Sequence, residues 1–205
     1  MSWLDRLGSS VPKTKAEEAE VDDGKERSAP GLASLFAALR ADGRHTVLDF
    51  GPAEGRRLRL LGRFARQVRF AALVPHPPRG TELTAALGGL EPDPGRRFDV
   101  VLVWDLFDRL DDGERHEVVE RIVDVTAAGA RLYAVVESSD AVSTRPIRTE
   151  LLELDRVRDE PVGPPEPARP QLLPAQMERL LAPFEVVSGV SLRSGLREYV
   201  AWRPV

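Results

Sequence analysis

Cysteine is absent from the 205-residue sequence, which excludes disulfide bonds, a thiol nucleophile and a cysteine-ligated metal site. The chain also has no apolar run near the roughly 20 residues that a membrane-spanning helix needs, so we expect no membrane span. Residues Met1 to Leu7 lack the basic and then apolar regions of a secretory signal peptide. These absences together predict a cytoplasmic protein.

A surplus of positive charge is also missing. The formal net charge is −4 and the isoelectric point is about 5.5, so neither nucleic acid nor an anionic membrane is expected as the main partner. The three histidines, His45, His76 and His116, are too far apart for a metal motif such as H-x-x-x-H, and we predict no metal site. No P-loop, G-x-S-x-G or Ser-His-Asp arrangement is present. The length fits one domain of ordinary size.

The N-terminal 30 residues differ in character from the rest of the chain. Residues 9–30 are polar and highly charged and cannot bury enough apolar surface to offset the entropy of ordering. We therefore predict a disordered tail over residues 1–30. Trp3, Leu4 and Leu7 lie on one face of a short helical turn, which is either a frayed terminus or a docking peptide for a protein partner.

From Gly31 onward, helical and strand patterns alternate along the chain. Helices are predicted at Leu32–Leu39, Arg56–Gln67, Thr81–Leu87, Glu114–Thr126 and Pro174–Leu181. Apolar strands are predicted at Thr46–Phe50, Val68–Val74, Phe98–Asp105 and Arg131–Glu137. This alternation predicts one α/β domain over residues 31–205, with a Rossmann-like, doubly wound and mostly parallel sheet.

Two regions depart from the simple alternation. Residues 139–171 are rich in proline in their second half and read as an irregular loop. Phe184–Leu192 and Leu196–Trp202 are joined by a three-residue turn and predict an antiparallel C-terminal hairpin. Only about twenty residues separate the second strand from Phe98, so the predicted sheet has six or seven strands.

The segment VLDFGPAEG is the most informative motif. An apolar strand ends at Asp49, and a turn with Gly51 and Gly55 opens a helix, which is typical of a strand that meets a ligand. The dinucleotide pattern G-x-G-x-x-G would need glycines where Ala53 and Arg56 stand. The pattern acid-x-G-x-G-x-G instead fits at every position except Ala53.

This second pattern resembles motif I of the class I S-adenosylmethionine (SAM)-dependent methyltransferases, and the resemblance covers about residues 31–203. FDVVLVWDLFDRL, the Gly129 helix end before GARLYAVVE, and the C-terminal hairpin match as well. Trp104-Asp105 and Arg193-Ser194-Gly195-Leu196-Arg197-Glu198 resemble bacterial methyltransferase-like proteins. The resemblance implies SAM as cofactor, methyl transfer to a small-molecule or protein acceptor, and cofactor-binding roles for Asp49, Gly51, Ala53, Gly55, Trp104 and Asp105.

The chain departs from the family in the adenosine half of the expected site. An acid normally ends the second strand and binds the ribose, but Leu73 and Val74 stand there, followed by Pro75. Asp93 is the one acid placed to contact the adenine. These departures support an alternative function, a catalytically inactive methyltransferase-fold protein that acts as a binding or assembly partner.

Several candidate residues have structural alternatives. Asp105, His116 and Glu137 are candidates for a catalytic base, although methyl transfer depends mainly on positioning and does not require one. Asp49 is also suited to capping a turn, Trp104 to the core, and His116 to a helix surface. Two charged groups are interpreted as solvated faces. One is the acidic group Asp108, Asp111, Asp112 and Glu114, and the other is the arginine group Arg56, Arg57, Arg59, Arg63 and Arg66.

Overall fold

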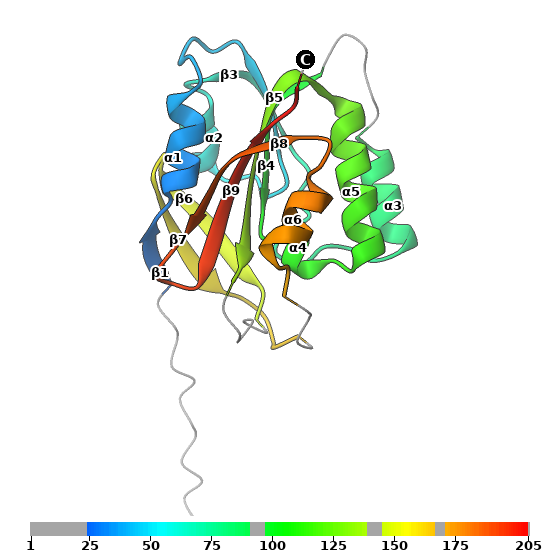
Figure 1. Ribbon diagram of the computed structural model, residues 1–205. Helices are drawn as coiled ribbons and strands as arrows, with labels where there is room; N and C mark the ends of the chain where they lie inside the picture. Colours follow the sequence, from blue (N-terminus) through cyan, green and yellow to red (C-terminus); the bar gives the residue numbers. More distant parts are fainter. Residues whose placement is uncertain (1–23, 91–96, 139–144, 167–170, 205) are drawn as a thin grey trace, which may run out of the picture.

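The computed structural model describes residues 24–90, 97–138, 145–166 and 171–204, and they form two β-sheets with helices packed around the larger one (Figure 1). The larger sheet has six strands in the order β3-β2-β4-β5-β9-β8. The smaller sheet has three strands in the order β1-β7-β6. The tail residues Trp3, Leu4 and Leu7, and Asp93, lie outside the described residues.

The larger sheet confirms the predicted Rossmann-like architecture. Its first four strands in spatial order run parallel, whereas β9 is antiparallel to both β5 and β8. The strands are β2 (His45–Asp49), β3 (Ala65–Phe70), β4 (Phe98–Trp104), β5 (Thr126–Glu137), β8 (Glu185–Ser191) and β9 (Leu196–Trp202). The sheet therefore has six strands, the lower of the two predicted numbers, with the predicted C-terminal hairpin.

Helices cover both faces of this sheet, as doubly wound folds require. Figure 1 shows α1 and α2 on one side and α3, α5 and α6 on the other. The helices are α1 (Pro30–Ala37), α2 (Gly55–Leu61), α3 (Thr81–Gly88), α4 (Leu106–Arg109), α5 (Asp112–Val125) and α6 (Pro174–Leu180). Asp111 and Glu114 form a capping box at the start of α5, and this fixes where that helix begins.

The hydrophobic core lies between the sheet and these helices. The central strand β4 is fully buried from Val100 to Trp104, which explains its continuous apolar sequence. The edge strand β3 instead carries exposed polar residues at Arg66, Gln67 and Arg69. Strand β3 pairs only with β2; it starts three residues earlier than the apolar pattern predicts and ends at Phe70.

The smaller sheet corrects two predictions. Its strands are β1 (Lys25–Ser28), β6 (Ile147–Glu153) and β7 (Arg156–Pro161), all antiparallel. The prediction of disorder is therefore wrong for Lys25–Ser28, and the prediction of an irregular loop is wrong for residues 147–161. Buried apolar residues are few here, namely Leu151 and Val157, and ion pairs join Glu26 to Arg156 and Arg158 at 2.7 and 2.6 Å. Charged strands of this kind have no apolar alternation to detect.

Within the described ranges, no helix combines the length and apolar character needed to cross a membrane. The same ranges contain no group of three or more histidine, aspartate or glutamate side chains placed to hold a metal ion.

Candidate functional site

The candidate site lies where the strand order reverses, at the carboxyl ends of β2 and β4. The chain leaves β2 outward to β3 and later returns to the other side of β2 as β4, so the loops after β2 and β4 diverge. In open α/β sheets this divergence creates the ligand crevice. Asp49 is the last residue of β2 and Trp104 is the last residue of β4.

Asp49 is fully buried and is the centre of a hydrogen-bond cluster. Its Oδ1 atom accepts hydrogen bonds from the Gly51 backbone N–H at 2.8 Å, the Trp104 indole Nε1 at 2.6 Å and Arg57 Nη1 at 3.3 Å. Its other oxygen, Oδ2, has no hydrogen-bond partner among the described residues. Burial raises the pKa of Asp49 above its usual value, although these three donors and the charge of Arg57 oppose the shift.

Arg57, in the first turn of α2, fills the space beside this carboxylate. Its guanidinium lies 4.6 Å above the Trp104 ring and donates to the Thr149 backbone carbonyl from β6. Only 1% of Arg57 is exposed, whereas Arg56, Arg59, Arg63 and Arg66 are exposed. The interpretation of the arginine-rich helix as a solvent face is therefore wrong for Arg57. We call Asp49, Arg57 and Trp104 the Asp49 cluster.

Trp104 holds an unusual backbone conformation. Its φ angle is +59°, in the left-handed region that side chains other than glycine seldom adopt. The indole packs edge-on against Tyr133, with ring centroids 5.6 Å apart, and is buried. The core interpretation of Trp104 is thus correct, and its cofactor-binding role stays a prediction. Strain of this kind is concentrated at functional sites.

Strand β6 closes the crevice from outside. A cavity of about 10 Å³ remains between Arg57, Trp104, Asp105, Thr149 and the Val74-Pro75 segment. That volume holds roughly one water molecule. Small-molecule pockets have volumes of roughly 300–1,000 Å³, so the crevice is nearly filled by the protein's own side chains.

A second group of acids follows β4. Asp105 is buried and pairs with Arg109 at 3.2 Å, but its Oδ1 has no hydrogen-bond partner in the described part of the chain. Burial raises the pKa of Asp105. Asp108 accepts a hydrogen bond from the Glu137 backbone N–H at 2.7 Å, and burial raises the pKa of Asp108 to about 7. Asp108 is therefore not the solvated acid that the sequence predicts.

The structure brings together only some of the predicted residues. Asp49, Gly51, Trp104 and Asp105 line or adjoin the crevice, and Glu137 lies beside Asp108 at the end of β5. Ala53 and Gly55 are exposed. His116 is exposed on α5 and lines a separate cavity of about 220 Å³ between α5 and α6, as its surface interpretation predicts.

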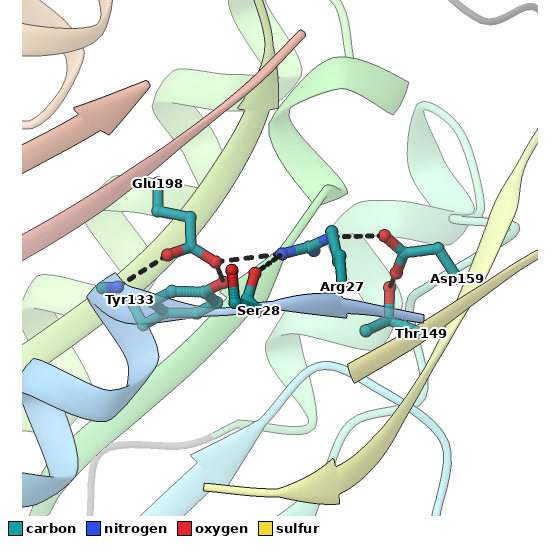
Figure 2. Close-up of polar contacts among 7 residues, drawn as sticks. Arg27, Ser28, Tyr133, Thr149, Asp159 and Glu198 are labelled. Carbon is teal, nitrogen blue, oxygen red and sulfur yellow. Dashed lines mark hydrogen bonds and ion pairs between the residues drawn. The ribbon is translucent and has the colours of Figure 1, made fainter. Parts of the chain in front are cut away.

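A second buried charge cluster lies beside the first. Figure 2 shows Arg27 of β1 between Glu198 of β9 and Asp159 of β7. Glu198 also accepts hydrogen bonds from the Tyr133 hydroxyl at 2.8 Å and the Gly31 backbone N–H, and Asp159 accepts one from the Thr149 hydroxyl at 2.8 Å. We call Arg27, Tyr133, Thr149, Asp159 and Glu198 the Arg27 cluster. Thr149 joins the two clusters, because its hydroxyl contacts Asp159 and its carbonyl contacts Arg57.

Sequence reasoning missed Arg57 and Thr149 as parts of the site. A signal for Arg57 is present, because Arg57 and Leu61 follow the i, i+4 spacing of one buried helix face. Thr149 carried no comparable signal, since β6 itself was not predicted.

The fold is similar to several solved methyltransferase structures. One is the 1,6-didemethyltoxoflavin-N1-methyltransferase of Burkholderia thailandensis, bound to 1,6-didemethyltoxoflavin and S-adenosylhomocysteine. It has 22% sequence identity and a TM-score of 0.49, and the match covers 86% of this chain and 77% of that one. The N-methyltransferase NodS of Bradyrhizobium japonicum has 12% identity, a TM-score of 0.49 and coverage of 84% and 91%. The glycopeptide N-methyltransferase MtfA has 19% identity, a TM-score of 0.46 and coverage of 84% and 94%.

No family model matches the sequence, and no curated protein matches it. At the identities and TM-scores above, the likeness to solved structures carries no functional argument. The strand order and the antiparallel C-terminal hairpin by themselves give the chain a Rossmann-like, doubly wound fold.

Proposed function

We propose that the chain is a SAM-dependent methyltransferase whose cofactor binds beside Asp49. The observation that supports this most directly is the Asp49 carboxylate, fully buried at the switch point with one oxygen unpartnered among the described residues. Glu54 Oε2 and Asp105 Oδ1, on the loops after β2 and β4, are also buried without a partner there. SAM carries positive charge on its ammonium and sulfonium groups, and unpartnered carboxylate oxygens are the groups that balance such charge.

The residues fit this cofactor only in part. The acids around Asp49 suit its cationic half. The residues after β3, from Ala71 to Val74, include no carboxylate for the ribose hydroxyls, and Leu73 and Val74 are buried in the core. With Arg57 in place the crevice has no room for the whole cofactor. We therefore assign no residue a step in methyl transfer.

The methyl acceptor, in this proposal, is a small molecule or a protein. Asp105 and Glu137 remain the candidates for a base, since Asp105 follows β4 at the crevice and Glu137 ends the neighbouring strand β5. His116 is the weaker candidate, because it lies on the far cavity between α5 and α6.

A second candidate function is that of an inactive methyltransferase-fold protein that binds a partner. The filling of the crevice by Arg57 and Trp104 favours it, as does the lack of a carboxylate after β3. The N-terminal residues Trp3, Leu4 and Leu7 are then the proposed partner contact.

Calorimetric titration of the full chain with SAM and with S-adenosylhomocysteine tests the two candidates. Binding in the micromolar range, weakened at least tenfold by Asp49→Ala and unaffected by Asp124→Ala on the exposed side of α5, supports the enzyme. Absence of heat and of any thermal shift at millimolar ligand rejects it and favours the second candidate. Binding that Asp49→Ala leaves unchanged places the cofactor elsewhere on the fold.

A further inference from the structure

We propose that Arg57 is an internal ligand of the crevice, whose guanidinium occupies a cation-binding cradle made by Asp49, Trp104 and the Thr149 carbonyl. An external cation binds there only when the Arg57 side chain leaves. The identity of that external cation as SAM rests on the proposed function, but the cradle itself does not.

The contacts of Arg57 are those expected of a bound ligand. A carboxylate oxygen lies 3.3 Å from Nη1, the indole face lies 4.6 Å from the guanidinium carbon, and the Thr149 carbonyl accepts from Nη2. These are three separate modes by which proteins recognise a planar cation, namely an ion pair, a cation–π contact and a carbonyl acceptor. They come from β2, β4 and β6, so the cradle is assembled by the fold.

The absence of a side chain at Gly51 leaves the space that the Arg57 guanidinium fills. A β-carbon at this position would overlap Nη1 of Arg57 and would lie 2.9 Å from Arg57 Cζ and 3.0 Å from Asp49 Oδ1. Gly51 is not among the described glycines with a left-handed backbone, so its conformation does not require glycine here. The glycine that the sequence motif assigns to cofactor approach therefore makes room for the chain's own guanidinium.

The match between Arg57 and the cradle is incomplete. Nε of Arg57 and Oδ2 of Asp49 are both buried, and neither has a hydrogen-bond partner among the described residues. An internal ligand binds more weakly when one donor and one acceptor in its site have no hydrogen-bond partner. An external cation with its own donors can therefore compete with it. The chemical class is a guanidinium, a primary ammonium or a sulfonium compound.

Chemical rescue tests the cradle without any cofactor. Arg57→Ala removes the internal ligand, and guanidinium chloride at about 10 mM should then raise the melting temperature of the variant by about 3 °C. The wild type and Arg59→Ala, which changes an exposed arginine on the same helix, should show no rise. Sodium chloride at equal ionic strength is the salt control. Equal responses in Arg57→Ala and the wild type would overturn the proposal.

If Arg57→Ala does not fold on its own, the cradle can still be tested. Refolding with and without about 10 mM guanidinium then becomes the measurement. Recovery of a cooperative thermal transition in guanidinium supports the cradle, and no recovery overturns it.

A SAM titration separates this inference from the proposed function. Arg57→Ala should bind SAM about tenfold more tightly than the wild type, because the cofactor no longer displaces a buried side chain. Arg57→Lys keeps a cation and should resemble the wild type. Guanidinium rescue with no SAM binding to any variant supports the cradle and rejects the methyltransferase proposal. If the wild type and Arg57→Ala bind SAM with equal affinity and guanidinium gives no rescue, the cradle is rejected and the methyltransferase proposal is supported.

Discussion

The two buried charge clusters meet at Thr149 but differ in how completely they are satisfied. In the Arg27 cluster, both oxygens of Glu198 and both oxygens of Asp159 accept hydrogen bonds. In the Asp49 cluster, one carboxylate oxygen and the guanidinium Nε have no partner among the described residues. Both clusters are desolvated, so the unmatched polar atoms of the second cost stability that the first does not lose.

This difference indicates different roles. The Arg27 cluster joins β1, β7 and β9 and has no free acceptor among its members for a ligand, which is typical of a structural network. The Asp49 cluster lies at the switch point of the sheet and keeps an unpartnered acceptor beside a strained Trp104. Incomplete satisfaction and backbone strain at one place are typical of a binding site.

The largest effect is expected from breaking the satisfied cluster. Glu198→Ala leaves the Tyr133 hydroxyl and the Gly31 N–H without this acceptor and removes one of the two carboxylates that pair with Arg27. Loss of one partner of a buried charged network costs about 3–5 kcal/mol of unfolding free energy. Urea denaturation measures this, with Glu120→Ala on the exposed face of α5 as the control. A loss below about 1 kcal/mol would mean that the cluster does not hold the two sheets together.

A smaller effect is expected from the pH dependence of the acids beside the crevice. In the folded protein, Asp108 keeps its proton up to a pKa of about 7, whereas the unfolded chain loses it near the ordinary value of 3.8. The stability that the protonated carboxyl contributes is therefore present below pH 4 and is lost as the pH rises through 7. Asp108→Asn cannot ionise and keeps an acceptor for the Glu137 N–H.

The unfolding free energy of the wild type should thus fall by about 1–3 kcal/mol relative to that of Asp108→Asn between pH 4 and pH 8. This is less than the full pKa shift would give, because the carboxyl is only partly buried. Thermal denaturation of both proteins across this range measures the difference. Parallel stability curves would show that Asp108 is ionised in the folded protein at neutral pH.

The smallest effect tests whether Gly51 accommodates Arg57. Gly51→Ala should destabilise the wild type by about 1–2 kcal/mol, because the new methyl group displaces the guanidinium from the cradle. In an Arg57→Ala background the same substitution should cost at least about 0.5 kcal/mol less, since the space is already open. A double-mutant cycle of denaturation free energies measures this coupling. Additive effects would show that Gly51 and Arg57 do not compete for one space.

The large sheet could be predicted because its strands are apolar and its helices periodic. Val100 to Trp104 must be buried on both faces, and a turn with Gly51 must follow Asp49. The smaller sheet could not be predicted, because Lys25–Ser28 pairs with the distant strand β7 and because the β6–β7 hairpin, although local, is made of charged strands with few buried apolar residues. Neither pairing has an apolar signature in the sequence.

The sequence predicts where the candidate site lies, but not which side chain fills it. Asp49 accepts hydrogen bonds from Gly51 and Trp104, and Asp105 directly follows Trp104, because strand ends in a parallel sheet share one edge. The occupant, Arg57, could not be foreseen with certainty from charge alone, because arginine on a helix is usually solvated. Its burial depends on Thr149, which is 92 residues away in sequence.

The pairing of β1 with β7 has a consequence for synthesis on the ribosome. Arg27 is 132 residues from Asp159 and 171 residues from Glu198. Strand β1 must therefore wait, unpaired, while β2 to β6 emerge, and its arginine reaches Glu198 only after β9 has emerged. Contacts of such long range form late in folding. The ion pair that joins β1 to β9 therefore forms only after the β6–β7 hairpin, whose Thr149 encloses the crevice, has been synthesised.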